Sequence, residues 1–173
     1  LRKNLQINMQ GKVNKNFQGE IRYPDTTDYI TEKVKYNIKV EVPHKEGCPR
    51  YSGVTIAGVS VGESPEWIKK ALMSIDVKPI NNIVDITNFV LHELGQPLHA
   101  FDADKINGKK IIVDCLPDGT SFITLDGVER KLKSKDLMIN EGEKNPLCMA
   151  GVYGGLGSGV SKETTTVFLE SAY

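Results

Sequence analysis

The sequence lacks the features that mark membrane proteins, disulfide scaffolds and structural zinc sites. No apolar run approaches the roughly 20 residues that a helix needs to cross a bilayer. The three cysteines, Cys48, Cys115 and Cys148, are far apart and lack the short paired spacing of a zinc site. An odd number of cysteines and no signal peptide favour a reduced, cytoplasmic setting.

The sequence has no excess of positive or negative charge, because 22 basic and 22 acidic residues give a formal net charge of zero. At 173 residues and 39% hydrophobic, the chain is long enough for one domain with a sizeable core. Residues 51–173 hold 12 basic and 16 acidic residues, a net charge of −4. A surface for nucleic-acid phosphates must therefore be local or supplied by other chains.

The N-terminal part of the chain differs in composition from the rest. Residues 1 to about 35 are rich in Asn, Lys, Gln and Thr, with few large apolar side chains at helical or strand spacing. This composition predicts a linker or a peripheral arm, followed by a folded domain over residues 36–173. Because Leu1 is not an initiator methionine and Tyr173 directly follows a strand-like run, we interpret the sequence as a piece of a larger protein.

Two helices are predicted in the first half of the domain. Ser64 as a hydroxyl N-cap, with Pro65 at the first helical position, predicts a helix that ends near Ile75. A second helix is predicted over residues 82–94, with Gly95 at the usual stop position. The apolar stripe of this second helix is expected to comprise Ile83, Ile86, Val90 and Leu94.

Short strands are predicted on both sides of these helices. The alternation of apolar and polar residues over 36–42, and the β-branched residues over 51–61, predict two early strands. The later strands are expected over residues 110–115, 121–125, 128–132, 137–140, 146–150 and 166–172. The pair Asp126-Gly127 is a two-residue hairpin signal. The predicted fold class is therefore α+β, with mostly antiparallel sheet layers and two principal helices.

A candidate polar pocket follows from the region after the second helix. Thr87 and Asn88 lie near the end of that helix, and His99 follows on a predicted loop, where Pro97 limits the backbone freedom. These side chains can converge on one site. Alternatively, His99 hydrogen-bonds a backbone carbonyl, while Thr87 and Asn88 satisfy local backbone groups.

Two C-terminal segments offer further candidates. Glu170 lies in an apolar run, so it must be paired or hydrogen-bonded if it is buried, although strand alternation alone could point it to water. Residues 150–155, Ala-Gly-Val-Tyr-Gly-Gly, match neither a phosphate loop nor a dinucleotide fingerprint. They form either a flexible loop or a wall where bare glycine backbone approaches a ligand.

Four motifs together resemble a known family. They are Cys48-Pro49-Arg50-Tyr51, the pair Thr87-Asn88 with the later Gln96-Pro97-Leu98-His99-Ala100-Phe101-Asp102, the Ala-Gly segment 150–155, and Val167-Phe168-Leu169-Glu170-Ser171-Ala172. In this order they resemble the β subunit of bacterial phenylalanyl-tRNA synthetase, in its B3/B4 editing domain. The resemblance runs from about Ile38 to Ala172.

This resemblance implies an editing hydrolase that removes tyrosine wrongly attached to tRNA(Phe), within an enzyme that attaches phenylalanine elsewhere. His99 and Asn88 would then lie near the ester as catalytic residues, and Glu170 would accept a hydrogen bond from the phenolic hydroxyl of tyrosine. The other substrate-binding residues that the resemblance implies are Thr87, Ala150, Gly151, Gly154 and Gly155. The implied hydrolysis uses a positioned water rather than a covalent nucleophile.

The resemblance also implies the partners and cofactors. The partners are the tRNA(Phe) acceptor end, tyrosine and the synthetase α subunit of an α2β2 heterotetramer, with no membrane involved. Editing needs no cofactor or metal, whereas the parent enzyme uses ATP and magnesium outside this sequence, which cannot aminoacylate by itself. The alternative is a non-catalytic module that binds amino acid or tRNA, or packs between subunits. A metal hydrolase is disfavoured because His44, His92 and His99 lack ligand spacing with the cysteines.

Overall fold

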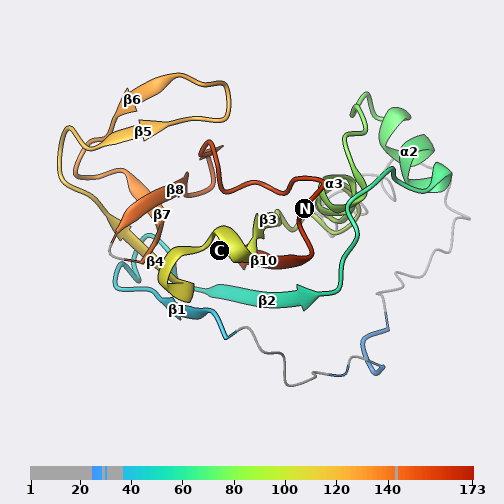
Figure 1. Cartoon of the computed structure of the whole chain (residues 1–173), viewed down its shortest axis with the longest axis horizontal. Helices are drawn as coiled ribbons and strands as arrows, with labels where there is room; N and C mark the ends of the chain where they lie inside the picture. The colour runs from blue at the N-terminus through green and yellow to red at the C-terminus, as the bar shows by residue number, and fades with distance from the viewer. Residues whose placement is uncertain (1–24, 29, 31–36, 143) are drawn as a thin grey trace, which may run out of the picture.

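A computed structural model describes residues 25–28, 30, 37–142 and 144–173. The linker or arm predicted over residues 1–35 falls mostly outside these described residues, as does the start of the first predicted strand at Tyr36. Within the described part, the fold is α+β, with two α-helices and sheets that are antiparallel except for one strand pair (Figure 1). The predicted fold class is therefore confirmed.

The larger sheet has five strands. In spatial order they are β1 (Lys39–Glu41), β4 (Lys110–Cys115), β7 (Leu137–Glu141), β8 (Asn145–Met149) and β9 (Tyr153–Gly154). The pair β1 and β4 is parallel, and the other neighbours are antiparallel. Two short 3₁₀ helices, η1 (Ala103–Lys105) and η2 (Asn107–Lys109), come directly before β4 in the chain.

A three-stranded antiparallel sheet carries β10 (Thr166–Ala172) at its centre, between β2 (Tyr51–Ala57) and β3 (His99–Asp102). Strand β2 ends at Ala57, earlier than the predicted Val61, because Gly58 turns the backbone into the left-handed region with φ of 74°. The predicted loop at His99 is wrong, since His99 is the first residue of β3.

Buried side chains from both sheets meet in one core. Phe101 of β3 and Phe168 of β10 contact the same apolar cluster as Ile111 of β4 and Ile139 of β7, and all four are almost fully buried. The hairpin of β5 (Ser121–Ile123) and β6 (Glu129–Lys131) has its own smaller core around Phe122. In Figure 1 this hairpin lies at the opposite end of the molecule from the helices.

The first helix, α2 (Glu66–Met73), begins differently from the sequence prediction. Pro65 is its N-cap residue and makes no side-chain capping bond, while the Ser64 hydroxyl donates to the fully buried Asp85 carboxylate. The assignment of Ser64 as the N-cap is therefore wrong. A buried carboxylate needs donors, and the Ser64 hydroxyl and the Ile80 N–H supply them.

The second helix, α3 (Asn82–Leu94), has the predicted bounds. The Asn81 side chain accepts hydrogen bonds from two backbone N–H groups of the first turn, and Gly95 ends the helix with φ of 75°. Three residues of the predicted apolar stripe are half-buried, namely Ile83, Val90 and Leu94, but Ile86 is 44% exposed. The fully buried residues of the helix are Asp85 and Thr87. The buried side of α3 is therefore centred on Asp85, which accepts hydrogen bonds from Ser64 and from the Ile80 N–H, beside the apolar stripe.

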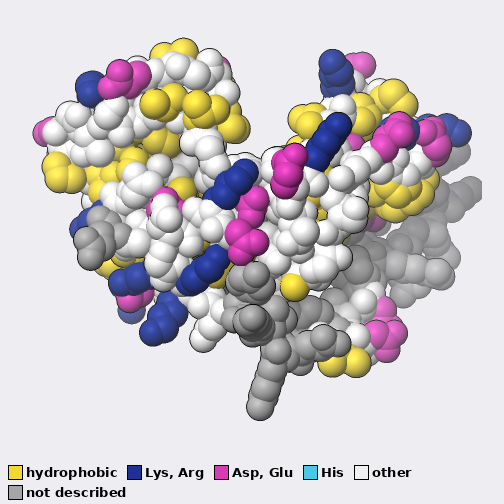
Figure 2. Space-filling view, in the orientation of Figure 1, with side chains coloured by type: hydrophobic (Ala, Val, Ile, Leu, Met, Phe, Trp, Pro, Cys, Tyr) yellow, Lys and Arg dark blue, Asp and Glu magenta, His cyan; other side chains and the backbone are white. Residues whose placement is uncertain are grey.

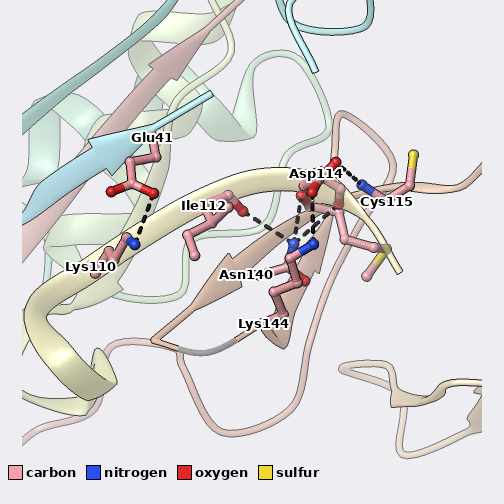
Figure 3. Close-up of polar contacts among 8 residues, drawn as sticks. Glu41, Lys110, Ile112, Asp114, Cys115, Asn140 and Lys144 are labelled. Atoms are coloured by element: carbon pink, nitrogen blue, oxygen red, sulfur yellow. Dashed lines mark hydrogen bonds and ion pairs between the residues drawn. The ribbon is translucent and has the colours of Figure 1, made fainter. Parts of the chain in front are cut away.

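Polar contacts join β1, β4 and β7 (Figure 3). The Lys110 ammonium pairs with the Glu41 carboxylate at 2.8 Å, and the Asn140 amide donates to the carbonyls of Ile112 and Asp114 at 3.1 Å each. The pairing of β7 with β8 shifts register between Ile139 and Asn140. These bonds link the strands of the five-stranded sheet. Strand β8 of this sheet and the segment after it lie next to β3 and β10 of the three-stranded sheet.

Candidate functional site

A pocket of about 280 Å³ lies where β3, β10, β8 and the segment after β8 meet. It is lined by Pro97, Leu98, His99, Cys148, Gly151, Val152, Tyr153, Gly154, Glu170 and Ala172. Drug-sized ligands occupy pockets of about 300–1,000 Å³, so this pocket suits a smaller molecule such as an amino acid.

Strand register places two candidate residues opposite each other. In the pairing of β10 with β3, Glu170 is the partner of His99, and on the other side of β10 it is the partner of Gly53. Directly opposed side chains in an antiparallel pair share one face of the sheet. The fold therefore brings Glu170 and His99 to the same pocket from positions 71 residues apart in the sequence, 99 and 170.

Glu170 is a buried acid with one internal hydrogen-bond donor. The residue is only 8% exposed, and the Tyr51 hydroxyl donates to its Oε2 atom at 2.8 Å. Burial raises the pKa of Glu170 to about 7, and the hydrogen bond from Tyr51 opposes that rise. The other oxygen, Oε1, accepts no hydrogen bond from the described residues, so it is left for a ligand in the pocket.

Tyr51 is the contact that sequence reasoning missed. The residue belongs to the motif Cys48-Pro49-Arg50-Tyr51, but nothing in its local sequence connects it to an acid 119 positions away. Burial, and then the neighbouring Glu170, raise the pKa of Tyr51 far above its ordinary value. The hydroxyl therefore keeps its proton and acts as a donor to Glu170.

His99 contributes a largely desolvated imidazole. Its ring makes an edge contact with Phe101, with ring centroids 4.4 Å apart. Burial lowers the pKa of His99, which favours the neutral imidazole at neutral pH. Within the described part of the chain no group hydrogen-bonds this ring, so its nitrogens are available to a water or a ligand group.

The glycine segment divides between the pocket and the core. Gly151 and Gly154 line the pocket, and a Cβ atom added at Gly154 would lie 3.6 Å from Cε1 of His99 and 2.8 Å from Cδ1 of Leu125. Gly155 faces inward instead, since a Cβ atom there would lie 2.3 Å from the Leu147 carbonyl oxygen. Ala150 packs against the main core.

The remaining candidates on α3 lie away from this lining. Thr87 is buried, and its hydroxyl donates to the Val84 carbonyl at 2.7 Å, as a helical threonine often does. Asn88 is half-buried on the same helix. The structure thus brings His99, Glu170, Gly151 and Gly154 together, but places Thr87, Asn88, Ala150 and Gly155 outside the pocket lining.

The thiol of Cys148 in the pocket is a poor nucleophile. Cys148 lines the pocket, and burial, followed by the charge of Glu170, raises its pKa to about 12. A protonated thiol is a poor nucleophile at neutral pH. Within the described residues, no group of three or more His, Cys, Asp or Glu side chains gathers where it could hold a metal ion.

The site can therefore bind and orient a small ligand. One side offers a carboxylate oxygen to a hydrogen-bond donor, another offers a neutral imidazole, and Gly154 leaves room for both at close range. Fold and pocket together define the class, an α+β domain with a small ligand pocket that contains an acid. The chain belongs to the B3/4 domain family, whose model matches residues 47–173.

Relatives from two different genera carry the same name. The chain is 54% identical over 156 residues to the phenylalanine–tRNA ligase beta subunit of Bacteroides fragilis, which covers 90% of this chain and 19% of that protein. It is 52% identical over 153 residues to the protein of the same name from Porphyromonas gingivalis, covering 88% and 19%. The chain thus spans about a fifth of the length of the curated relatives it matches.

A solved structure supports the fold. The chain matches an N-terminal fragment of the phenylalanyl-tRNA synthetase beta-subunit from Pyrococcus horikoshii with a TM-score of 0.55. The match covers 80% of this chain and 45% of the other at 18% identity, a level that supports the fold alone. No helix in the described part of the chain is long and apolar enough to cross a membrane.

Proposed function

We propose that this chain is the editing domain of a phenylalanyl-tRNA synthetase β subunit, and that it hydrolyses tyrosine from mischarged tRNA(Phe). The observation that carries this proposal is the buried Glu170, which lines a pocket of amino-acid size and has one carboxylate oxygen with no hydrogen bond from the described residues. The shared name of relatives at about half identity supports the enzyme in which the domain works.

Selectivity follows from the cost of an unpaired polar group. A tyrosine hydroxyl can donate a hydrogen bond to Oε1 of Glu170. Phenylalanine would desolvate that oxygen without supplying a hydrogen bond in return. Sites built to recognise a hydroxyl reject the analogue that lacks it by as much as ~10⁴–10⁵-fold. Phe-tRNA would therefore escape hydrolysis while Tyr-tRNA is captured.

Hydrolysis needs a water near the ester and a group that orients it. His99 lies opposite Glu170 on the neighbouring strand, so its neutral imidazole can hold that water or take its proton. The ester would be set against the bare backbone around Gly151 and Gly154, where N–H groups could face the developing oxyanion. No metal or cofactor is needed for this step, and the ATP and magnesium of the parent enzyme would act elsewhere.

The rest of the assembly would deliver the substrate. Residues 51–173 carry 12 basic and 16 acidic residues, whereas tRNA binding depends on many contacts from basic side chains to phosphates. The tRNA(Phe) acceptor end would therefore be brought to this pocket by other domains of the β subunit and by the α subunit. The isolated chain would consequently hydrolyse Tyr-tRNA poorly.

One observation favours the alternative of a packing module. Large apolar side chains are exposed on the helical end, including Trp67, Met73, Ile80 and Ile86, and on the hairpin, including Ile123, Leu125 and Val128. Figure 2 shows such side chains gathered on two raised ends of the molecule with a hollow between them. Exposed apolar surface of this kind marks contacts with other chains or domains, which an editing domain within a larger subunit would also have.

The assembled synthetase tests the proposed function. We expect Tyr-tRNA(Phe) to be hydrolysed at least about 100-fold faster than Phe-tRNA(Phe), a lower bound on the ~10⁴–10⁵-fold rejection that hydroxyl-recognising sites reach. Treatment with a chelator, followed by restored magnesium to keep the tRNA folded, should leave this rate unchanged. Activity that returned only with added zinc would contradict the metal-free mechanism, and no hydrolysis of either substrate would support the packing module.

A further inference from the structure

Tyr51 reaches Glu170 diagonally across two strands. Tyr51 is the partner of Ala172 in the register of β2 with β10, and Glu170 lies two residues from Ala172 on the same face of β10. Diagonal neighbours of this kind are about 7–8 Å apart, which an aromatic side chain spans. The register thus brings the Tyr51 hydroxyl to Oε2 of Glu170.

The residue directly opposite Glu170 on β2 does not block the contact between Tyr51 and Glu170. Gly53 is the direct partner of Glu170 on β2, and a Cβ atom added there would lie 2.2 Å from the end of the Phe168 ring. No side chain at position 53 therefore comes between Tyr51 and the acid. The hydrogen bond from Tyr51 fixes one oxygen of the carboxylate, and the position of the other oxygen follows from that.

The other groups around Glu170 make no hydrogen bond to it in the described part of the chain. The titratable side chains near it are His99 on β3, Cys148 on β8, Cys48 before β2 and Tyr153 at the pocket wall. The pocket lining includes no lysine or arginine. Among the described residues, the Tyr51 hydroxyl makes the only hydrogen bond to the Glu170 carboxylate, with no cation beside it.

We propose that Tyr51 is a positioning residue that holds Glu170 through Oε2 and thereby presents Oε1 to the hydroxyl of the bound amino acid. The inference rests on the proposed function and adds a specificity-determining residue to its site. A donor to the carboxylate also favours its ionised form, and hydrogen bonds to ionised groups are roughly twice as strong as neutral ones. Tyr51 would therefore control both the direction and the charge of the group that recognises tyrosine.

The test compares Tyr51→Phe with wild type in the assembled synthetase, by the pH profile of kcat/KM for Tyr-tRNA hydrolysis. This profile reports the groups of the free enzyme. In wild type the acid limb should reflect Glu170 ionising as the pH rises, so activity falls on acidification. Loss of the Tyr51 hydroxyl should move that limb to higher pH and lower kcat/KM at pH 7 by about fivefold.

Three further variants make the result specific. Tyr173→Phe removes the hydroxyl of a tyrosine that is 85% exposed, and it should leave the profile unchanged. Glu170→Gln should abolish the acid limb assigned to Glu170, which separates it from any limb due to His99. A fluorinated tyrosine at position 51 keeps the ring and donates more strongly, so the limb should move to lower pH even if Tyr51→Phe fails to fold.

The outcomes separate the two levels of the proposal. If wild type prefers Tyr-tRNA, and the limb moves up in Tyr51→Phe and down with the fluorinated residue, the positioning role is supported. If wild type prefers Tyr-tRNA but the limb stays in place in both variants, the role of Tyr51 is overturned while the editing function stands. If wild type hydrolyses Tyr-tRNA and Phe-tRNA alike, the proposed function itself fails, and this inference with it.

Discussion

Glu170→Ala is expected to remove the preference of this chain for tyrosine over phenylalanine. In wild type, a hydrogen bond from the tyrosine hydroxyl to an ionised acceptor contributes about 1.5–3 kcal/mol, or roughly a 10- to 150-fold difference in affinity. Without the carboxylate both amino acids should bind weakly and alike. Calorimetry of the 173-residue chain with each amino acid at neutral to mildly alkaline pH measures the difference.

The design includes a matched substitution and a pH series. Glu93→Ala removes an exposed acid from α3 and should retain the preference for tyrosine. Because burial raises the pKa of Glu170 to about 7, the acid is ionised above that value and protonated below it. Tyrosine affinity should therefore fall as the pH drops through 7, while phenylalanine affinity should rise, because a protonated acid costs less to desolvate than an ionised one. Equal wild-type affinities, reduced alike in Glu170→Ala, would contradict the selectivity claim.

His99→Ala is expected to slow Tyr-tRNA hydrolysis in the assembled synthetase by about 100-fold or more, the usual contribution of a positioned acid or base. Formation of Phe-tRNA should be nearly unchanged, because the synthetic site lies elsewhere in the proposed enzyme. Single-turnover deacylation and aminoacylation assays on the same preparation measure both. The assembled enzyme is needed because residues 51–173 carry a net charge of −4, from 12 basic and 16 acidic residues.

Two other substitutions make this experiment informative. His92→Ala removes an exposed histidine of α3 and should leave hydrolysis at the wild-type rate. Asn88→Ala tests the role that the family resemblance implies, although Asn88 lies outside the pocket lining. A wild-type rate in His99→Ala would show that the imidazole does not act on the reacting ester.

The parts of the fold with strong local signals were predictable from the sequence. Helix α3 ends where Gly95 adopts positive φ, and β4 and β10 have the bounds that their apolar runs predict. The face of α3 was not predictable in this way, because Asp85 is held by Ser64 and Ile80 from outside the helix. An apolar stripe gives the period of a helix, but distant polar partners can decide its orientation.

The assembly of the site was even less predictable from the sequence than the orientation of α3. Motifs near His99 and Glu170 marked both residues as candidates, since each belongs to a segment with its own recognisable pattern. Their meeting depends on the register of β3 with β10, and the bond from Tyr51 depends on the register of β2 with β10. The hydrogen bond that this register allows joins residues 119 positions apart, and a single sequence does not specify the register. The site roles of Thr87, Asn88, Ala150 and Gly155 stay predictions from the resemblance.

The most direct test of the account is a crystal structure of this chain with tyrosine bound. We expect the amino acid in the pocket between Glu170 and His99, with its phenolic oxygen about 2.5–3.0 Å from Oε1 of Glu170. The bond from Tyr51 to Oε2 should persist, and the carboxyl end of tyrosine should point toward His99. A pocket that stays empty at saturating tyrosine, or tyrosine bound with its hydroxyl away from Glu170, would contradict the central claim.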